Sequence, residues 1–275
     1  MTGTLITGAS AGLGRALALH LAEAGEALIL VARRGEALAA LAGEIRDRSE
    51  AAGVNAPEVH LIPLDLTRSD AIPLLEAGLE RHQISPDQIH TLICNAGVGH
   101  LGPFTRQSPE SVEAAMALNV VSLTRLVHWL APVMADIPVG SAASPGRRSI
   151  CLIASVAAFT PGPLMAVYYA TKSYVLSLGE SLREELRPQG VTVTVACPGP
   201  FQSEFHRAAG IAGGGGSVAA LPTAAATAAR ILKGMHRGSA VITPGVTVAL
   251  WALVGPRLPR WLARKLMHWI QKYRS

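Results

Sequence analysis

Thr7-Gly8-Ala9-Ser10-Ala11-Gly12-Leu13-Gly14 is the stretch that decides the fold of this chain. It follows a short apolar run at Thr4–Thr7 and leads into a helical pattern in which Leu13, Leu17 and Leu21 recur every four residues. Glycines at a strand-to-helix turn let the backbone approach a pyrophosphate, and the helix N-terminus offers free N–H groups to it. A tight turn without a ligand is the alternative, but the strand–turn–helix context favours a dinucleotide site.

The rest of the chain continues to alternate short apolar runs with helical periodicity. This alternation predicts one parallel sheet with helices on both faces, and right-handed crossovers place the ligand at the carboxyl ends of the strands. We expect a single-domain Rossmann-type doubly wound α/β fold with about seven strands. The expected strands are Thr4–Thr7, Ala27–Ala32, Val59–Leu64, Thr91–Cys94, Ser149–Ala154, Val191–Cys197 and Ala240–Thr243. Besides the helix after the glycine turn, helices are expected at about 36–52, 70–82, 109–135, 168–187 and 222–236.

Composition excludes several classes of protein. Of the 275 residues, 49% are apolar and 16% are charged, which excludes disorder across the chain. The longest clean apolar run near the C-terminus, Val246–Val254, falls well short of the roughly 20 residues of a membrane-spanning helix. No basic region followed by an apolar stretch precedes Gly8, so we expect no signal peptide. The three cysteines lack metal-ligand spacing, so we expect reduced buried thiols, no metal site and a cytoplasmic protein.

The positive charge is concentrated at one end of the chain. Residues 246–275 hold six cations and no acid, and the remaining residues hold 18 cations against 19 acids. A basic stripe across the fold, which nucleic-acid binding requires, is not visible in the sequence. We therefore expect no nucleic-acid partner.

Tyr168 and Lys172 are the first candidates for chemistry, because residues four apart share a helix face. An ammonium near a phenol stabilises the phenolate and lowers its pKa from about 10, which suits proton transfer near neutral pH. Ser155 could hydrogen-bond a substrate oxygen from a second direction. The partner of Tyr169 at the same spacing is Ser173, so Tyr169 lacks a cation and is assigned to packing or to the substrate wall.

These elements resemble the short-chain dehydrogenase/reductase family in its single-domain branch. The resemblance runs from about residue 4 to 205 and includes T-G-x-x-x-G-x-G, the Cys94–Gly97 element and Y-x-x-x-K thirteen residues after Ser155. Cys94 departs from the first position of the family's N-N-A-G element, and the alanine at 11 excludes the extended branch. The resemblance implies catalytic roles for Asn119, Ser155, Tyr168 and Lys172. It implies cofactor contacts for Gly8, Ser10, Ala11, Gly12, Leu13, Gly14, Arg33, Arg34, Asp65, Leu66, Asn95, Ala96, Gly97, Tyr168, Lys172, Pro198, Gly199 and Ser203.

The end of the second strand predicts which cofactor is bound. Relatives that prefer NAD place an acid there to bind the ribose hydroxyls, whereas this chain reads Val31-Ala32-Arg33-Arg34. Arginine can meet a 2′-phosphate in a bidentate fashion, so NADP is favoured over NAD. In the alternative, Arg33 only stacks on the adenine and Arg34 is solvated.

The implied reaction is hydride transfer between the nicotinamide and a carbonyl or secondary alcohol. The glycine-rich segment at about 208–221 follows Pro198 and predicts a nonpolar substrate and a lid. Two alternatives stay open: a membrane-surface reductase of lipid-like ketones, and a non-catalytic cofactor-sensing protein, which would more often have lost Tyr168 or Lys172. The resemblance also implies a homodimer or homotetramer formed through 116–134 and 175–186.

Residues 246–275 form a basic, tryptophan-containing helical tail after a catalytic domain at 1–245. A helix from about 258 would place apolar side chains on one side, namely Leu258, Leu262, Leu266, Trp269 and Tyr273. Tryptophan and basic residues on an amphipathic helix suggest contact with a membrane surface. We expect the other alternative, a helix that packs on the body or on a partner subunit and closes the substrate cleft.

Overall fold

A parallel seven-stranded sheet forms the centre of the computed structural model, which describes residues 3–137, 148–202 and 221–272. The strand order is β3-β2-β1-β4-β5-β6-β7, so the direction of winding reverses between β1 and β4. The strands are β1 (Gly3–Thr7), β2 (Ala27–Ala32), β3 (Val59–Pro63), β4 (Ile89–Cys94), β5 (Arg148–Ile153), β6 (Val191–Ala196) and β7 (Val241–Ile242). Such a reversal opens a crevice at the carboxyl ends of the two central strands.

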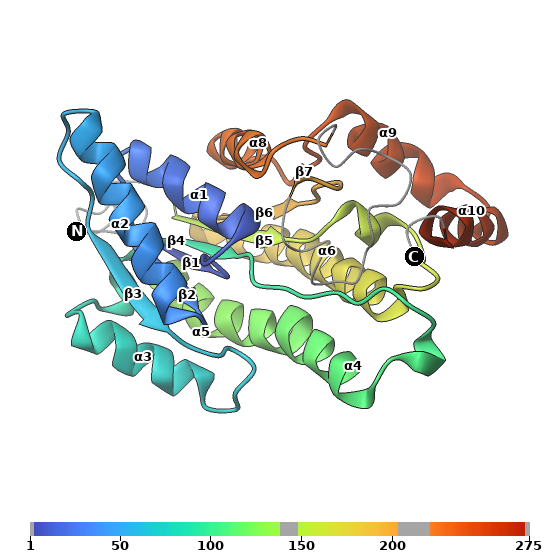
Figure 1. Ribbon diagram of the computed structural model, residues 1–275, viewed down its shortest axis with the longest axis horizontal. Coiled ribbons are helices and arrows are strands. Elements are labelled where there is room, and N and C mark those ends of the chain that lie inside the picture. Colours follow the sequence, from blue (N-terminus) through green and yellow to red (C-terminus); the bar gives the residue numbers. More distant parts are fainter. Residues whose placement is uncertain (1–2, 138–147, 203–220, 273–275) are drawn as a thin grey trace.

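Helices cover both faces of this sheet (Figure 1). They are α1 (Gly12–Glu23), α2 (Gly35–Ala51), α3 (Ala71–Arg81), α4 (Pro109–Met116), α5 (Leu123–Asp136), α6 (Ala166–Leu186), α8 (Ala224–His236), α9 (Val246–Val254) and α10 (Arg260–Lys272). Buried side chains of α1, α2 and α8 form one hydrophobic core with the sheet, and those of α3, α5 and α6 form a second core on the other face. The expected fold class is therefore confirmed.

Each of the seven expected strands is present, with ends that differ from the prediction by at most two residues. The expected helix at 109–135 differs in one respect, because residues Ala117–Ser122 between α4 and α5 form a π-helical turn. Its apolar spacing continues through the turn, so periodicity alone could not reveal it.

Among the described residues, Pro109–Asp136 is the one stretch with the length and apolar composition of a membrane span. Leu126, Leu130 and Met134 from it are buried in the core against the sheet.

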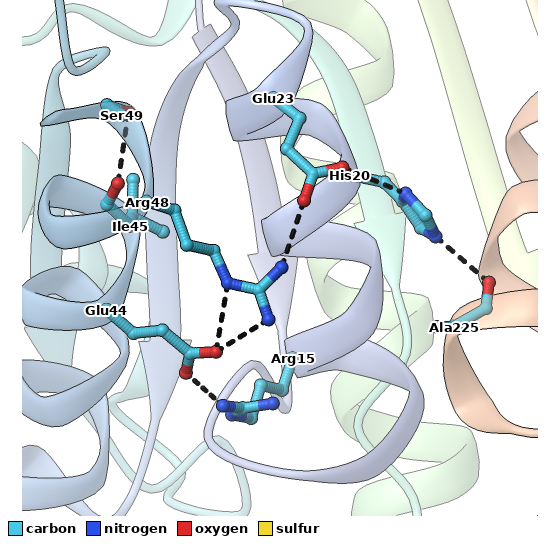
Figure 2. A network of polar contacts seen from close by, with 8 residues as sticks. All are labelled: Arg15, His20, Glu23, Glu44, Ile45, Arg48, Ser49 and Ala225. Carbon is cyan, nitrogen blue, oxygen red and sulfur yellow. Dashed lines mark hydrogen bonds and ion pairs between the residues drawn. The ribbon is translucent and has the colours of Figure 1, made fainter. Parts of the chain in front are cut away.

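A network of polar contacts joins α1, α2 and α8 behind the glycine turn (Figure 2). Arg48 of α2 bridges Glu44, at 2.9 Å, and Glu23 of α1, at 3.0 Å, and Arg15 of α1 reaches back to Glu44. Nε2 of His20 lies 3.0 Å from the carbonyl oxygen of Ala225 at the start of α8. These contacts are largely exposed and each contributes little alone, but together they fix α1, whose N-terminus faces the crevice.

Candidate active site

The turn between β1 and α1 has the geometry of a phosphate cradle. Gly8 and Gly12 adopt positive φ of 67° and 53°, which favours glycine. A Cβ on Gly8 would lie 2.8 Å from the Cα of Ala96, and one on Gly14 would lie 2.4 Å from the carbonyl oxygen of Gly8. The N-cap residue of α1 is Ala11, which makes no side-chain hydrogen bond to the first N–H groups of the helix. The turn therefore fits a dinucleotide pyrophosphate.

A set of hydrogen bonds between β1 and β4 holds this turn in place. The hydroxyl of Thr7 accepts from the backbone N–H groups of Asn95, at 3.0 Å, and Ala96, at 3.1 Å. The amide nitrogen of Asn95 donates to the carbonyls of Thr7, at 3.0 Å, and Gly8, at 3.2 Å. The side chain of Asn95 thus positions the glycine turn. Thr7 has an equally important role that the motif reading did not assign to it.

Arg33 and Arg34 lie at the far end of the same cleft, where β2 ends and α2 begins. Arg34 is the N-cap of α2 and donates from Nη2 to the hydroxyl of Ser10 at 3.3 Å. Burial tends to raise the pKa of Asp65, but two hydrogen bonds from Thr67 and the charge of Arg33 outweigh it, so this pKa is lowered. The region therefore combines two guanidinium groups with the positive end of a helix dipole, an arrangement suited to an anion.

Asn119 lies in the π-helical turn and is almost fully buried. Its Oδ1 accepts from the N–H of Val98 at 2.9 Å, and its Nδ2 donates to the carbonyl of Val98 at 2.8 Å and to the hydroxyl of Thr171 at 3.0 Å. Thr171 in turn donates to the carbonyl of Tyr168 at 2.8 Å. Asn119 therefore joins the loop after β4 to the first turn of α6, which carries Tyr168.

Lys172 is buried at the same place. Its Nζ donates to the carbonyl of Ile153 at 2.8 Å, and a Cβ on Gly97 would lie 3.3 Å from it and 3.1 Å from Oδ1 of Asn119. Burial lowers the pKa of Lys172 to about 8. The glycine at 97 is required because the ammonium and the amide both approach its Cα.

The pKa of Tyr168 differs from the expectation. Burial raises it to about 12, and the hydrogen bond with Ser155 opposes this shift only in part. The Nζ of Lys172 lies 5.8 Å from the centroid of the phenol ring and donates a hydrogen bond to the carbonyl of Ile153 instead. The expected lowering of the Tyr168 pKa by Lys172 is therefore wrong in this structure, because desolvation of the phenolate is the largest cause of the shift. Tyr168 is a protonated phenol at neutral pH.

The strand ends β5 and β6 complete the site. Ser155 follows β5, accepts at its hydroxyl from the N–H of Ala157 at 3.1 Å and hydrogen-bonds Tyr168. After β6, the carbonyl of Pro198 accepts from the N–H of Val156 at 2.8 Å, which ties the two strand ends together. A Cβ on Gly199 would lie 2.6 Å from a methyl of Val248 in α9. Ser203 and all but the last residue of the expected lid at 208–221 lie outside the described residues.

One cleft of about 520 Å³ runs past these groups. Except for Gly14, Asn119 and Ser203, each residue expected at the site lines it: the glycine turn, the two arginines, Asp65 and Leu66, the residues 95–97, the candidate catalytic residues Ser155, Tyr168 and Lys172, and Pro198 with Gly199. Gly14 and Asn119 lie behind the residues that line the cleft. Sequence reasoning missed several other lining residues, namely Val98, His100, Ala157, Met165, Phe201 and Gln271. None belongs to a motif, and only the fold brings them together.

The C-terminal helix α10 forms part of the wall of this cleft. Its buried residues are Ala263, Met267 and Gln271, whereas Leu262 and Trp269 are exposed. The helix therefore packs on the body, but not through the side that carries Leu262 and Trp269. Small Ala263 allows the helix to approach the body, and Met267 packs with Ala157, Met165 and Tyr169. Tyr273 lies outside the described residues. Tyr169 is a wall residue, as expected, and its ring stands edge-on to that of Tyr168 with 6.2 Å between centroids.

Comparisons with known proteins agree with this geometry. The family model of short chain dehydrogenase matches residues 3–211. Sulfoacetaldehyde reductase of Chromohalobacter salexigens is 34% identical over 202 residues, which cover 73% of this chain and 72% of that protein. A short-chain dehydrogenase from Sphingobium yanoikuyae in complex with NADPH is 34% identical, covers 94% of both chains and has a TM-score of 0.75. A short chain dehydrogenase/reductase from Burkholderia phymatum in complex with NAD is 25% identical, covers 96% of this chain and 95% of that one, and has a TM-score of 0.76.

The buried ammonium of Lys172 predicts a pH dependence of stability. Because its pKa falls from 10.5 to about 8 on folding, the unfolded chain binds the proton more tightly between these values. The cost of burying the charge is thus fully present below pH 8 and is relieved as the pH rises towards 10.5. The Lys172→Met variant should gain in free energy of unfolding over wild type by up to about 3 kcal/mol below pH 8, and the gain should shrink as the pH rises.

Urea denaturation between pH 7 and 10 measures this difference; above pH 10 the raised pKa of Tyr168 acts with the opposite sign. Lys233→Met, at an exposed lysine of α8, is the control. A difference between Lys172→Met and wild type that is independent of pH would contradict the prediction.

Proposed function

Since this chain belongs to the short-chain dehydrogenase family of nicotinamide-dependent oxidoreductases acting on carbonyl and alcohol substrates, we propose that it interconverts a nonpolar ketone or aldehyde and its alcohol with NADP(H). The observation that carries the proposal is the convergence of Ser155, Tyr168 and Lys172 on one end of a cleft whose other end holds the glycine turn and two arginines. The same convergence argues against a cofactor-sensing protein without catalysis.

The protein supplies a proton and a position for the carbonyl. The bound nicotinamide would exchange the hydride with the carbonyl carbon. Tyr168, protonated because burial raises its pKa to about 12, donates its proton to the oxygen as negative charge develops there. The hydroxyl of Ser155 orients that oxygen from a second side. Lys172 would hold the ribose of the nicotinamide nucleotide, and its positive charge favours the phenolate that Tyr168 becomes.

Asn119 serves this arrangement as a positioning residue, through Val98 and Thr171. The family resemblance further implies that Asn119 anchors a water of a proton relay, and that role stays a prediction.

The two arginines support the choice of NADP. The two residues directly after β2 are Arg33 and Arg34, where relatives that prefer NAD place an acid for the ribose hydroxyls. Arg33 is close enough to Asp65 to lower its pKa, and Arg34 bends toward the glycine turn at Ser10. A 2′-phosphate between the two guanidinium groups would also face the N-terminus of α2.

The substrate end of the cleft supports a largely nonpolar carbonyl compound. Ala157 and Met165 line the cleft here, and Met267 packs behind it. Apolar walls of this kind stabilise a hydrocarbon group beside the reacting carbon.

The outer face of the tail favours a second, compatible function, which is reduction at a membrane surface. Val246 is 86% exposed, Trp261 56% and Trp269 59%, and α10 carries its basic residues among them. The ammonium of Lys265 lies 5.7 Å from the Trp261 ring, so apolar and cationic groups share one face. This pattern complements an anionic lipid surface.

We also propose a homodimer or homotetramer, as the family resemblance implies. Met116, Val121 and Tyr174 are exposed on the faces of α4, the π-helical turn and α6 that the family uses between subunits.

Tyr168→Phe tests the reaction. The variant keeps the ring but removes the proton donor, so carbonyl reduction followed by NADPH absorbance should fall by about 10²-fold or more. Tyr174→Phe, on an exposed face of the same helix, is the matched control and should keep wild-type activity. Full activity of Tyr168→Phe on a ketone that wild type reduces would disprove the assignment.

Arg33→Asp tests the cofactor. The change removes one partner of the 2′-phosphate and provides an acceptor for ribose hydroxyls, so the ratio of kcat/KM for NADPH to that for NADH should fall by roughly 1.5–3 kcal/mol in free-energy terms. A wild-type enzyme that prefers NADH would overturn the choice of NADP outright.

Exchange of Trp261 and Trp269 for serine tests the membrane surface. Wild type should co-sediment with vesicles rich in phosphatidylglycerol, more weakly at high salt, and the double variant should lose at least about tenfold in binding. Phe104→Ser, at an exposed aromatic residue outside the tail, is the control. If the double variant instead sediments as a smaller species and vesicle binding is absent in wild type, the tail forms a subunit interface.

A further inference from the structure

The amide of Gln271 is one of two places in the described residues where a buried polar side-chain atom has no hydrogen-bond partner. The atoms are Oε1 of Gln271 and Oγ1 of Thr160. Only Gln271 also lines the cleft. A buried carbonyl without a donor costs about 1–3 kcal/mol, so such a group at the wall of a ligand cleft calls for an explanation.

The nitrogen end of the Gln271 amide is held in place by a hydrogen bond. Nε2 of Gln271 lies 2.7 Å from the hydroxyl oxygen of Tyr169, and the helix around it is fixed by Met267 and Ala263. Gln271 is only 1% exposed. If the oxygen and nitrogen of the amide exchange places by a 180° rotation, the hydroxyl of Tyr169 donates to the amide oxygen. The NH₂ group is then the end without a hydrogen-bond partner. In either orientation one polar end of the amide has no partner among the residues that the structure describes.

The position of this amide relative to the reaction is also defined. Tyr169 follows the proton donor Tyr168, and the two rings lie 6.2 Å apart. The surrounding residues Ala157, Met165 and Met267 are apolar. The amide of Gln271 and the hydroxyl of Tyr169 are therefore polar groups in an otherwise apolar part of the wall, and Tyr168 packs against the same cluster.

We propose that Gln271 and Tyr169 form a polar subsite that binds a hydroxyl group of the substrate, separate from the reacting carbonyl. A hydroxyl can donate to the amide oxygen or accept from the amide nitrogen, so it satisfies the unpaired end in both orientations. The substrate class is thus a hydroxy-ketone or hydroxy-aldehyde with a hydrocarbon frame, or the corresponding diol. The inference deepens the proposed function and rests on it for the identity of the reacting group.

This subsite belongs to the tail of the chain. The family model ends at residue 211, whereas Gln271 lies 60 residues later on α10. The catalytic residues do not determine it, so it provides a means of substrate selection that is independent of them.

The test compares matched ketones. Cyclohexanones and decalones that carry a hydroxyl at varied positions are each paired with the analogue that has a methyl group in its place. For at least one pair, wild type should prefer the hydroxyl compound in kcat/KM, and Gln271→Met should lower that preference at least about tenfold, because a site that hydrogen-bonds a hydroxyl rejects its analogue strongly. His268→Ala, on the exposed side of α10, is the matched control.

Tyr169→Phe is the second variant, in case Gln271→Met does not fold. It should lower the same preference by about threefold or more, since the amide would lose the hydroxyl that holds it. If wild type reduces hydroxyl and methyl compounds equally well in every pair, or if both variants keep the wild-type preference, the subsite does not exist.

Binding separates this inference from the proposed reaction. The rise in Tm caused by each hydroxyl compound and its methyl partner is measured in the presence of NADP⁺. Discrimination in binding without reduction of any ketone would support the subsite and reject the reaction. Reduction without discrimination would reject the subsite alone, and the absence of both would reject both.

Discussion

The close approach of β1 and β4 at their carboxyl ends is the constraint on which the site depends. Gly8 and Ala96 meet so tightly that a side chain on Gly8 would contact the neighbouring backbone at 2.8 Å. The hydroxyl of Thr7 and the amide of Asn95 connect the two loops through four hydrogen bonds. Because the winding of the sheet reverses at this pair of strands, the loops diverge above them and leave the crevice that the cleft occupies. Polar groups that look like ligand contacts in the sequence are here used to hold the backbone in shape.

The residues proposed for proton transfer are likewise held in position by hydrogen bonds within the protein. Tyr168, Lys172 and Asn119 reach one place from α6 and the π-helical turn, and each is fixed by a backbone carbonyl or a neighbouring hydroxyl. Burial shifts the pKa of Tyr168 upward and that of Lys172 downward. Both shifts disfavour the charged form of the side chain in the folded protein. A bound molecule that brings its own charge or hydrogen bonds therefore changes these pKa values.

Much of this could be predicted from the sequence, and the exceptions have physical causes. The glycine turn, the strands and the Tyr168–Lys172 pair are local patterns, whose spacing alone determines which side chains share a face. The π-helical turn at Asn119 did not follow from the sequence, because the three- and four-residue spacing of Met116, Val120 and Leu123 continues through it. The pKa of Tyr168 depends on how far Lys172 lies from the phenol and on how much water is excluded, and neither follows from a spacing of four. The side through which the tail docks did not follow from the sequence, because two of the residues that dock it, Ala263 and Gln271, are not conspicuously hydrophobic.

The docking of α10 couples the end of the chain to the cleft by thermodynamic linkage. A helix of 13 residues is marginal by itself in water, so α10 is helical because it is docked. The contacts that dock it, through Met267 and Gln271, are also contacts of the cleft wall. A molecule that fills the cleft adds to those contacts and must therefore stabilise the helix, and by reciprocity anything that stabilises the helix must tighten binding in the cleft. Helix α10 is in this respect an effector of the cleft that it borders, and a change that weakens its docking acts on affinity as well as on folding.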